Sequence, residues 1–208
     1  MSETRVERKE RTRRAILDAA LALSEDSSLV ALSLRQVARE VGVVPTAFYR
    51  HFDSLETLGL ALVDESFVSL RAMLRDVRHA EPARAGDYVG VVDDSVRILV
   101  DHVHQQRAHF RFIARERAAG PPAVREAVRR EIALCEQELA ADVARLPGTA
   151  GWSAEDLRIL SSLIVSAMVA TAEAVLLAAT PQDERRVVET ARAQLRMVLV
   201  GALHWRPT

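Results

Sequence analysis

The residues best suited to binding chemistry gather in one short stretch, from Ser33 to Phe52. A proline there is followed closely by hydroxyl, guanidinium and imidazole groups, which can donate hydrogen bonds to base edges and phosphate oxygens. Arginines outnumber acids in the stretch, so its local charge is positive although the chain carries a formal charge of −1. The pattern favours a site for nucleic acid. Its donors are Thr46, Tyr49, Arg50 and His51, and its other arginines are Arg35 and Arg39.

Two short helices are expected to position these donors. Ser33 opens a capping box, in which paired side chains satisfy the free N–H groups at a helix start. That helix should end at Gly42, and Pro45 suits the first turn of a second helix that continues to His51. The arrangement has the size of a helix-turn-helix. An ordinary helical corner, with its two phenylalanines as core anchors, is the alternative.

The rest of the chain is expected to be helical too. Eight glycines and seven prolines are few for 208 residues, and apolar residues recur at helical spacing. The predicted fold class is all-α, with a three-helix DNA-binding domain over residues 1–53 and a C-terminal helical domain for ligand binding and dimerisation over residues 54–208. The helices are expected at about residues 7–24, 33–41, 45–51, 54–79, 87–106, 108–118, 122–146, 153–180 and 182–203.

Enzymatic and metal-binding functions find no support in the sequence. It contains none of the common metalloprotease, serine hydrolase, paired-cysteine or dinucleotide-binding motifs. His102 and His104 lie two positions apart on a predicted helix, so they point in different directions and cannot hold one metal ion. Cys135 fits a small core residue better than a reactive thiol. We expect no catalytic residue, no metal and no cofactor.

A cytoplasmic location is expected. The single cysteine cannot form an internal disulfide, and the N-terminal segment is charged, without the apolar stretch of an export signal. Residues 159–180 are apolar enough to resemble a membrane span, but Glu173 lies within them and no aromatic belt flanks them. A core helix is therefore favoured.

The N-terminal sequence also resembles a known family. LRQVAREVGV at residues 34–43, followed by FYRHF at 48–52, is similar to the DNA-binding region of TetR-type transcriptional regulators. The resemblance implies that residues 45–51 form a recognition helix that binds a palindromic operator. It places Thr46 and Arg50 near bases and Tyr49 and His51 on phosphates, while Pro45 starts the helix and Ser33 and Arg35 brace the helix before it.

A narrower resemblance is to the FabR and DesT group of TetR-type repressors. It is carried by residues 45–52, 58–60, 63–66, 110–112 and 115–117, and it implies control of fatty-acid unsaturation or synthesis genes by long-chain acyl-CoA. The apolar residues expected to line the acyl chain are Phe67, Leu70, Met73, Leu74, Phe112 and Met168, and those expected to meet the phosphates are Arg111 and Arg115.

The last predicted helix carries apolar residues at spacings of three, four, three and four, which is typical of a helix that packs against a partner helix. TetR-type proteins dimerise through their last two long helices, so the resemblance implies a homodimer; a helix pair inside a monomer is the alternative. The interface residues expected are Val188, Ala191, Leu195, Val198 and Ala202.

Two other functions remain open at this point. A TetR-type repressor could sense another apolar small molecule and control an efflux or catabolic gene. A helical carrier or enzyme that does not bind DNA is a third possibility, but it gives no reason for arginine, threonine and tyrosine donors on a short solvent-facing corner.

Overall fold

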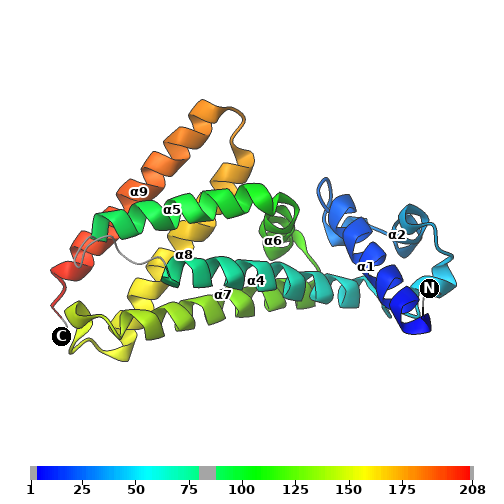
Figure 1. Cartoon of the computed structure of the whole chain (residues 1–208), viewed down its shortest axis with the longest axis horizontal. Helices are drawn as coiled ribbons and strands as arrows, with labels where there is room; N and C mark the ends of the chain where they lie inside the picture. Colours follow the sequence, from blue (N-terminus) through cyan, green and yellow to red (C-terminus); the bar gives the residue numbers. More distant parts are fainter. Residues whose placement is uncertain (1–3, 80–87, 207–208) are drawn as a thin grey trace. The chain divides into compact units, whose positions relative to one another are not determined.

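The structure, a computed structural model, describes residues 4–79 and 88–206. Every regular element in those ranges is a helix, which confirms the all-α fold class (Figure 1). Two of the elements are single 3₁₀ turns, η1 and η2, that the sequence patterns did not predict. The elements are α1 (Arg5–Leu23), η1 (Leu29–Ala31), α2 (Leu34–Val41), α3 (Pro45–Phe48), α4 (Leu55–His79), α5 (Tyr88–Gln105), α6 (Arg107–Ala119), α7 (Pro122–Val143), η2 (Pro147–Thr149), α8 (Ala154–Leu177) and α9 (Pro181–Leu203).

The chain divides into two compact units. Unit 1 comprises Met1–Val68 and Ala108–Arg129, and unit 2 comprises Ser69–Arg107 and Arg130–Thr208. Unit 1 therefore contains α6, which the sequence analysis assigned to the C-terminal domain. Compactness does not show which segment folds alone, so the predicted domain boundary after residue 53 stays a prediction.

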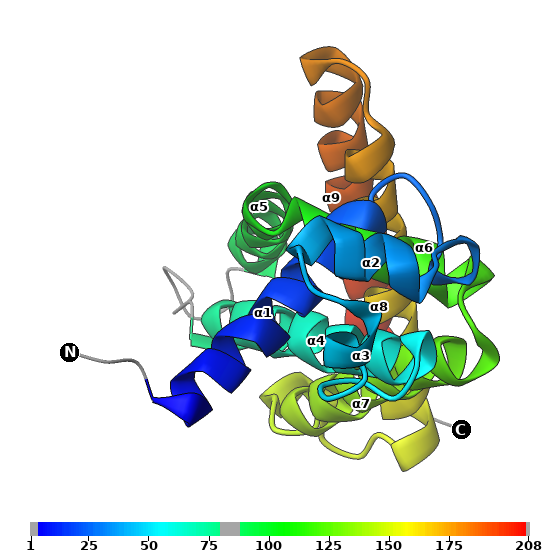
Figure 2. The same ribbon diagram turned by 90° about the vertical axis from the view of Figure 1, so that its right-hand side faces the viewer.

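Unit 1 has an apolar core beneath α2 and α3, in which α2 packs against α1 and α3 against α2 (Figure 2). Helices of eight and four residues are too short to persist alone in water, so burial has to hold them. They contribute apolar side chains to the core while their polar side chains stay outside. The core residues are Ile16, Leu17 and Ala20 of α1, Val37 and Ala38 of α2, Phe48 of α3, and Phe52.

The turn between α2 and α3 is fixed by Gly42, which has φ 73° and ψ 26°. The N–H of Val43 donates to the carbonyl of Ala38 at 2.9 Å, and the N–H of Gly42 donates to that of Arg39 at 3.1 Å. These two bonds form a Schellman motif, which ends the helix in the left-handed region that favours glycine. The turn therefore sets the angle at which α3 leaves α2.

Unit 2 is built on the hairpin of α8 and α9, on which α5 packs (Figure 1). Polar contacts hold the same three helices. Arg196 pairs with Asp93 at 2.8 Å and His104 contacts Glu184 at 3.1 Å, both between α9 and α5. The indole Nε1 of Trp205 donates to the carboxylate of Asp156 at 2.9 Å and joins the end of α9 to the start of α8.

Two residues predicted to lie at a subunit interface belong to the core of this unit instead. Ala191 and Leu195 are only 2% and 6% exposed, and they pack with Val92 and Val96 of α5. Val188 packs against the same cluster. The spacing pattern detected a helix partner correctly, but for these residues the partner is α5 of the same chain.

We predict that Gly42→Ala lowers the free energy of unfolding by about 1 kcal/mol, because an L side chain is strained at positive φ. A Cβ at Gly42 meets nothing within 4 Å, so the cost comes from the backbone alone. Urea denaturation measures it. Gly148→Ala is the control, since that position also has open space but no positive φ. Equal stability of the two variants would contradict the role given to the turn.

Candidate nucleic-acid interface

The helix-turn-helix segment, residues 33–52, presents a polar face to solvent. Tyr49 is 53% exposed, although it is next to Phe48, which is completely buried. The rings of these two residues meet edge to face with centroids 6.1 Å apart, so the buried ring supports the exposed one. The predicted DNA-binding residues that are exposed are Ser33, Arg35, Pro45, Thr46, Tyr49 and Arg50.

The recognition helix is shorter than predicted. α3 ends at Phe48, and the chain continues in tighter turns, with the N–H of Arg50 bonded to the carbonyl of Ala47 at 3.2 Å and that of His51 to the carbonyl of Phe48 at 2.8 Å. These are i→i+3 bonds of the 3₁₀ type. Residues 45–51 still form one continuous helical segment, so the exposed hydrogen-bond donors remain on a continuous surface.

Ser33 acts as the N-cap of α2. Its hydroxyl accepts the backbone N–H of Gln36 at 3.2 Å, and the Gln36 side chain accepts the backbone N–H of Ser33 at 2.8 Å. The predicted capping box is therefore present. Fixing the start of α2 in this way also fixes the backbone that carries the exposed side chain of Arg35, two residues after the cap.

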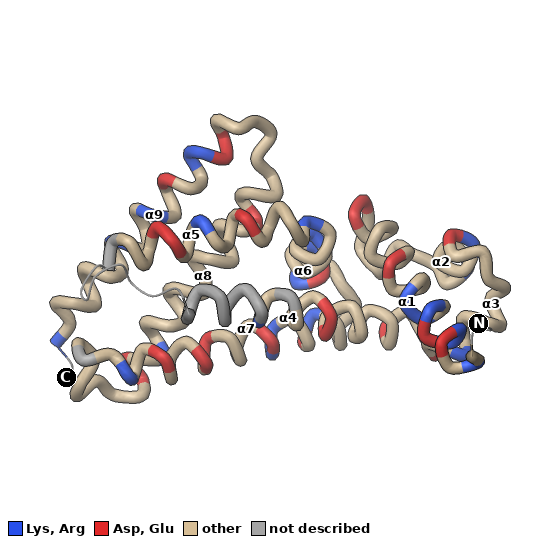
Figure 3. The backbone as a smooth tube through the Cα atoms, viewed as in Figure 1, with Lys and Arg blue, Asp and Glu red and all other residues tan. Residues whose placement is uncertain are grey.

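Helix α1 adds positive charge beside this segment. The guanidinium of Arg13 lies 4.5 Å from the centre of the Phe52 ring, a cation–π contact that ties α1 to the end of the segment. Charged residues gather at the N-terminal end of α1 (Figure 3). The exposed basic residues there are Arg5, Arg8, Lys9 and Arg11.

His51 is the one predicted DNA contact that is half-buried. Its Nδ1 is enclosed and has no hydrogen-bond partner. Burial, together with the positive charges of Lys9, Arg13 and Arg50, lowers the pKa of the imidazole. The ring is therefore neutral at neutral pH, so a phosphate contact would use Nε2–H as a donor.

The residues predicted to bind an effector are divided between the two compact units. Phe67 and Phe112 are completely buried in unit 1, whereas Leu70 and Met168 are half-buried in unit 2. Met168 packs beside the cluster that α5 and α9 form. The side chains of Met73 and Leu74 lie outside the described residues.

The two arginines predicted to meet effector phosphates have partners within unit 1. Arg111 donates to the carboxylate of Glu25 at 3.0 Å, and Arg115 donates to the backbone carbonyl of Ser24 at 3.0 Å. Both partners belong to the segment that follows α1. A role in ligand binding would require these contacts to break.

Sequence reasoning missed Glu116, which is completely buried. Its carboxylate accepts the backbone N–H of Leu29 at 3.0 Å and the hydroxyl of Ser28 at 3.1 Å. Burial raises the pKa of this carboxyl, and the two hydrogen bonds act in the opposite direction. The available signal was its position four residues after Phe112, on the inward face of α6.

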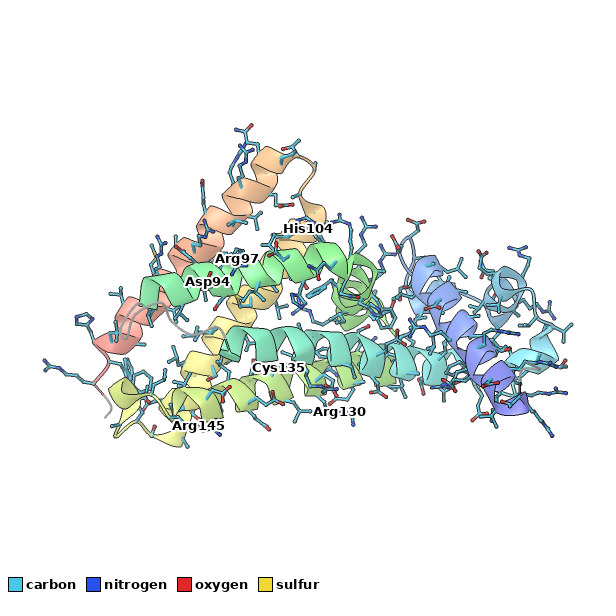
Figure 4. All side chains as sticks on the ribbon, in the orientation of Figure 1. Asp94, Arg97, His104, Arg130, Cys135 and Arg145 are labelled. Atoms are coloured by element: carbon cyan, nitrogen blue, oxygen red, sulfur yellow. The ribbon has the colours of Figure 1, made fainter. Side chains whose placement is uncertain are left out.

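No metal site is found among the residues that the structure describes, where no group of three or more potential ligands gathers. Asp94, Arg97 and His104 lie along α5, and Cys135 lies on α7 (Figure 4). Arg97 pairs with Asp94, and Cys135 is buried, as expected of a core residue.

In the described ranges, α8 is the one helix that is long and apolar enough to cross a membrane. Its most apolar window has a mean hydropathy of 2.0, and 22% of that window is buried within the chain. Core helices of soluble proteins have the same length and composition, so this is weak evidence for a span.

Comparison with known proteins matches the helix-turn-helix segment to a family. Residues 16–62, which include the whole helix-turn-helix segment, match the family described as bacterial regulatory proteins, tetR family. The helix-turn-helix segment of this chain is therefore similar to the DNA-binding region of TetR-family regulators. The match confirms the family resemblance of residues 34–52. It does not reach the FabR and DesT group, which stays a prediction.

Similarity of fold to solved transcriptional regulators extends along nearly the whole chain. A chain described as a transcriptional regulator from Pseudomonas aeruginosa PAO1 matches with a TM-score of 0.71 at 14% identity, over 95% of both chains. A regulator from Aquifex aeolicus VF5 matches with a TM-score of 0.66 at 13% identity, over 90% of this chain and 99% of that one. The multidrug binding protein EbrR, complexed with imidazole, matches with a TM-score of 0.56 at 20% identity, over 88% and 93%.

We predict that Arg50→Ala weakens operator binding and relaxes base preference, because one lost base contact costs about 1–3 kcal/mol. Tyr49→Ala should weaken binding to all sequences alike, as loss of a phosphate contact does. Fluorescence anisotropy at fixed salt, with a duplex that the wild type selects from a random library, measures both effects. Arg158→Ala, an exposed arginine of α8, is the charge-matched control. Wild-type affinity of the Arg50→Ala, Tyr49→Ala double variant would show that the interface lies elsewhere.

Proposed function

We propose that this chain is a TetR-family regulator, a ligand-responsive, cytoplasmic repressor that binds a palindromic operator as a homodimer. The observation that carries the proposal is the polar, exposed face of the helix-turn-helix segment over a buried aromatic core. A helix of this size fits the major groove, and its exposed donors suit base edges and phosphates. The alternative of a carrier or enzyme leaves this surface unexplained.

An apolar surface on α8 and α9 supports the homodimer. Large apolar side chains on both helices are about half exposed or more, although they belong to a helical hairpin whose other face is packed. Burying such a surface against a second copy gives a symmetric dimer, which presents two recognition helices to the two halves of a palindrome. The exposed residues are Ile159 and Leu163 of α8, at 46% and 53%, and Met197 and Val200 of α9, at 74% and 57%.

We predict that Met197→Glu produces monomers that retain the helical fold, because a charge on this apolar surface opposes its burial. Operator affinity should fall with the loss of the dimer. Gln182→Glu, which adds the same charge at an exposed position of α9, should remain dimeric. Leu195→Arg should instead lose folded protein, since Leu195 is buried within the chain. Size-exclusion chromatography with light scattering distinguishes these results, and a dimeric Met197→Glu variant would place the interface elsewhere.

The effector that we propose is a long-chain acyl-CoA, with fatty-acid unsaturation or synthesis genes as the regulated genes. The support is the resemblance of residues 45–52, 58–60, 63–66, 110–112 and 115–117 to the FabR and DesT group. The predicted apolar side chains suit an acyl chain, and the two arginines, which lie one turn apart on α6, suit phosphates. Such phosphates would compete with Glu25 and Ser24 for Arg111 and Arg115.

A second candidate is a sensor of another apolar small molecule that controls an efflux or catabolic gene. The observation that favours it is the shared fold with the multidrug binding protein EbrR over most of both chains. Both candidates use the same DNA-binding surface. They differ only in the ligand that shifts the affinity for DNA.

We predict that palmitoyl-CoA or oleoyl-CoA changes the affinity for the selected duplex by about fivefold or more, in the range of allosteric coupling. Free fatty acid and free coenzyme A are the controls, because each lacks one half of the ligand. Anisotropy titrations at saturating ligand test this. No change with either acyl-CoA would reject the acyl-CoA effector and favour the second candidate.

A further inference from the structure

We propose that three side chains of α6 position the helix-turn-helix segment directly, by holding the α1–α2 connection, residues 24–32. Arg111, Arg115 and Glu116 are then positioning residues for DNA recognition, although they lie on neither α2 nor α3. The inference rests on DNA binding by the helix-turn-helix segment, as proposed above. It assigns to the two arginines a role different from ligand binding.

The three side chains contact consecutive parts of the connection. The Nη1 atom of Arg111 donates to Oε2 of Glu25 at 3.0 Å, and Nη1 of Arg115 donates to the carbonyl of Ser24 at 3.0 Å. Positions 111 and 115 are one helical turn apart on the same face of α6, and position 116 lies about 100° further around the helix. The first half of the connection is therefore bound by charge-assisted hydrogen bonds.

Glu116 holds the second half of the connection. Its two oxygens accept the N–H of Leu29 and the hydroxyl of Ser28, which is also the N-cap of η1. A buried carboxylate left without these donors would be costly, so the contact favours the one arrangement of the α1–α2 connection that supplies both donors. Gly120 leaves the necessary room, because a Cβ there would lie 2.5 Å from Oε2 of Glu116.

Leu29 packs against α4 at Gly59, a position that Val124 of α7 also approaches. It is 1% exposed, and a Cβ at Gly59 would lie 2.5 Å from its Cδ1 and 2.9 Å from Cγ2 of Val124. Helix α2 begins at Leu34, only a few residues further on. A shift of α6 would therefore move the start of α2 through the α1–α2 connection itself, in addition to any movement through α4.

The pair of Arg111 and Glu25 allows a test that distinguishes two explanations, because a purely electrostatic effect on DNA affinity and a positioning role predict different results. Arg111→Gln removes a positive charge and Glu25→Gln removes a negative one, so electrostatic attraction to DNA alone would change affinity in opposite directions. If the pair positions α2, both substitutions should weaken binding to the selected duplex roughly two- to fivefold. The double variant should bind no more weakly than the weaker single variant, because both remove the same contact.

Two controls separate positioning from other effects. Arg158→Gln and Glu155→Gln make the same charge changes in a pair of α8, and they should leave the preference for the selected duplex over a scrambled duplex unchanged. For Arg111→Gln and Glu25→Gln that preference should fall, because a displaced recognition helix loses base contacts and keeps attraction to phosphates. Thermal unfolding of each variant identifies a temperature at which all variants are folded, and affinities are compared at that temperature.

Glu116 gives a second, independent measurement. Glu116→Ala should speed amide hydrogen exchange at Leu29 and in α2 and lower the preference for the selected duplex, whereas Glu116→Gln, which keeps an acceptor, should restore part of both. Opposite affinity changes for Arg111→Gln and Glu25→Gln, or an unchanged duplex preference in both, would overturn the proposal while leaving DNA binding intact. If the wild type selects no duplex, the proposed function fails and this inference fails with it.

Discussion

The packing of two phenylalanines beneath α3 is the constraint on which the DNA-binding surface depends. Phe48 and Phe52 are almost completely buried, with ring centroids 5.9 Å apart, and Arg13 of α1 covers the second ring. Helices as short as α2 and α3 gain little from their own backbone hydrogen bonds. The positions of α2 and α3 are therefore set by this core and by the glycine turn. The same two features set the positions of the hydrogen-bond donors on the exposed side of these helices.

Polar contacts complete what apolar packing leaves undetermined. Packing can keep the α1–α2 connection close to the core, but hydrogen bonds to Glu116 fix the positions of the Leu29 backbone N–H and the Ser28 hydroxyl. Their presence explains why α6 belongs to the same compact unit as the helix-turn-helix segment although many residues separate them. A regulator needs such a link, since a ligand can change DNA affinity only by binding one arrangement better than another.

Local patterns were sufficient to predict the helices and the DNA-binding segment. The capping box at Ser33, the left-handed turn at Gly42 and the start of a helix at Pro45 depend on neighbouring residues, and the structure has all three. The predicted recognition helix was too long because the spacing cannot distinguish an α-helix from a following 3₁₀ turn. The identity of the effector and of the operator is not encoded in such local patterns.

Long-range partners could not be predicted from the sequence in the same way. Periodicity shows that Ala191 and Leu195 face another helix, but it cannot tell whether that helix belongs to the same chain, and here it is α5. The sequence around Arg111 is typical of a surface residue, and it did not indicate that Glu25 is the ion-pair partner of Arg111. Both failures concern contacts between residues more than eighty positions apart.

Hydroxyl-radical footprinting of the wild type, free and saturated with the selected duplex, tests the DNA-binding surface most directly. Tyr49 and Trp205 have nearly the same exposure, 53% and 52%, so each serves as a reference for the other. The account predicts that DNA slows oxidation of Tyr49 severalfold and leaves that of Trp205 unchanged. Unchanged oxidation of Tyr49 in the saturated complex would contradict the assignment of the helix-turn-helix segment as the surface that binds DNA.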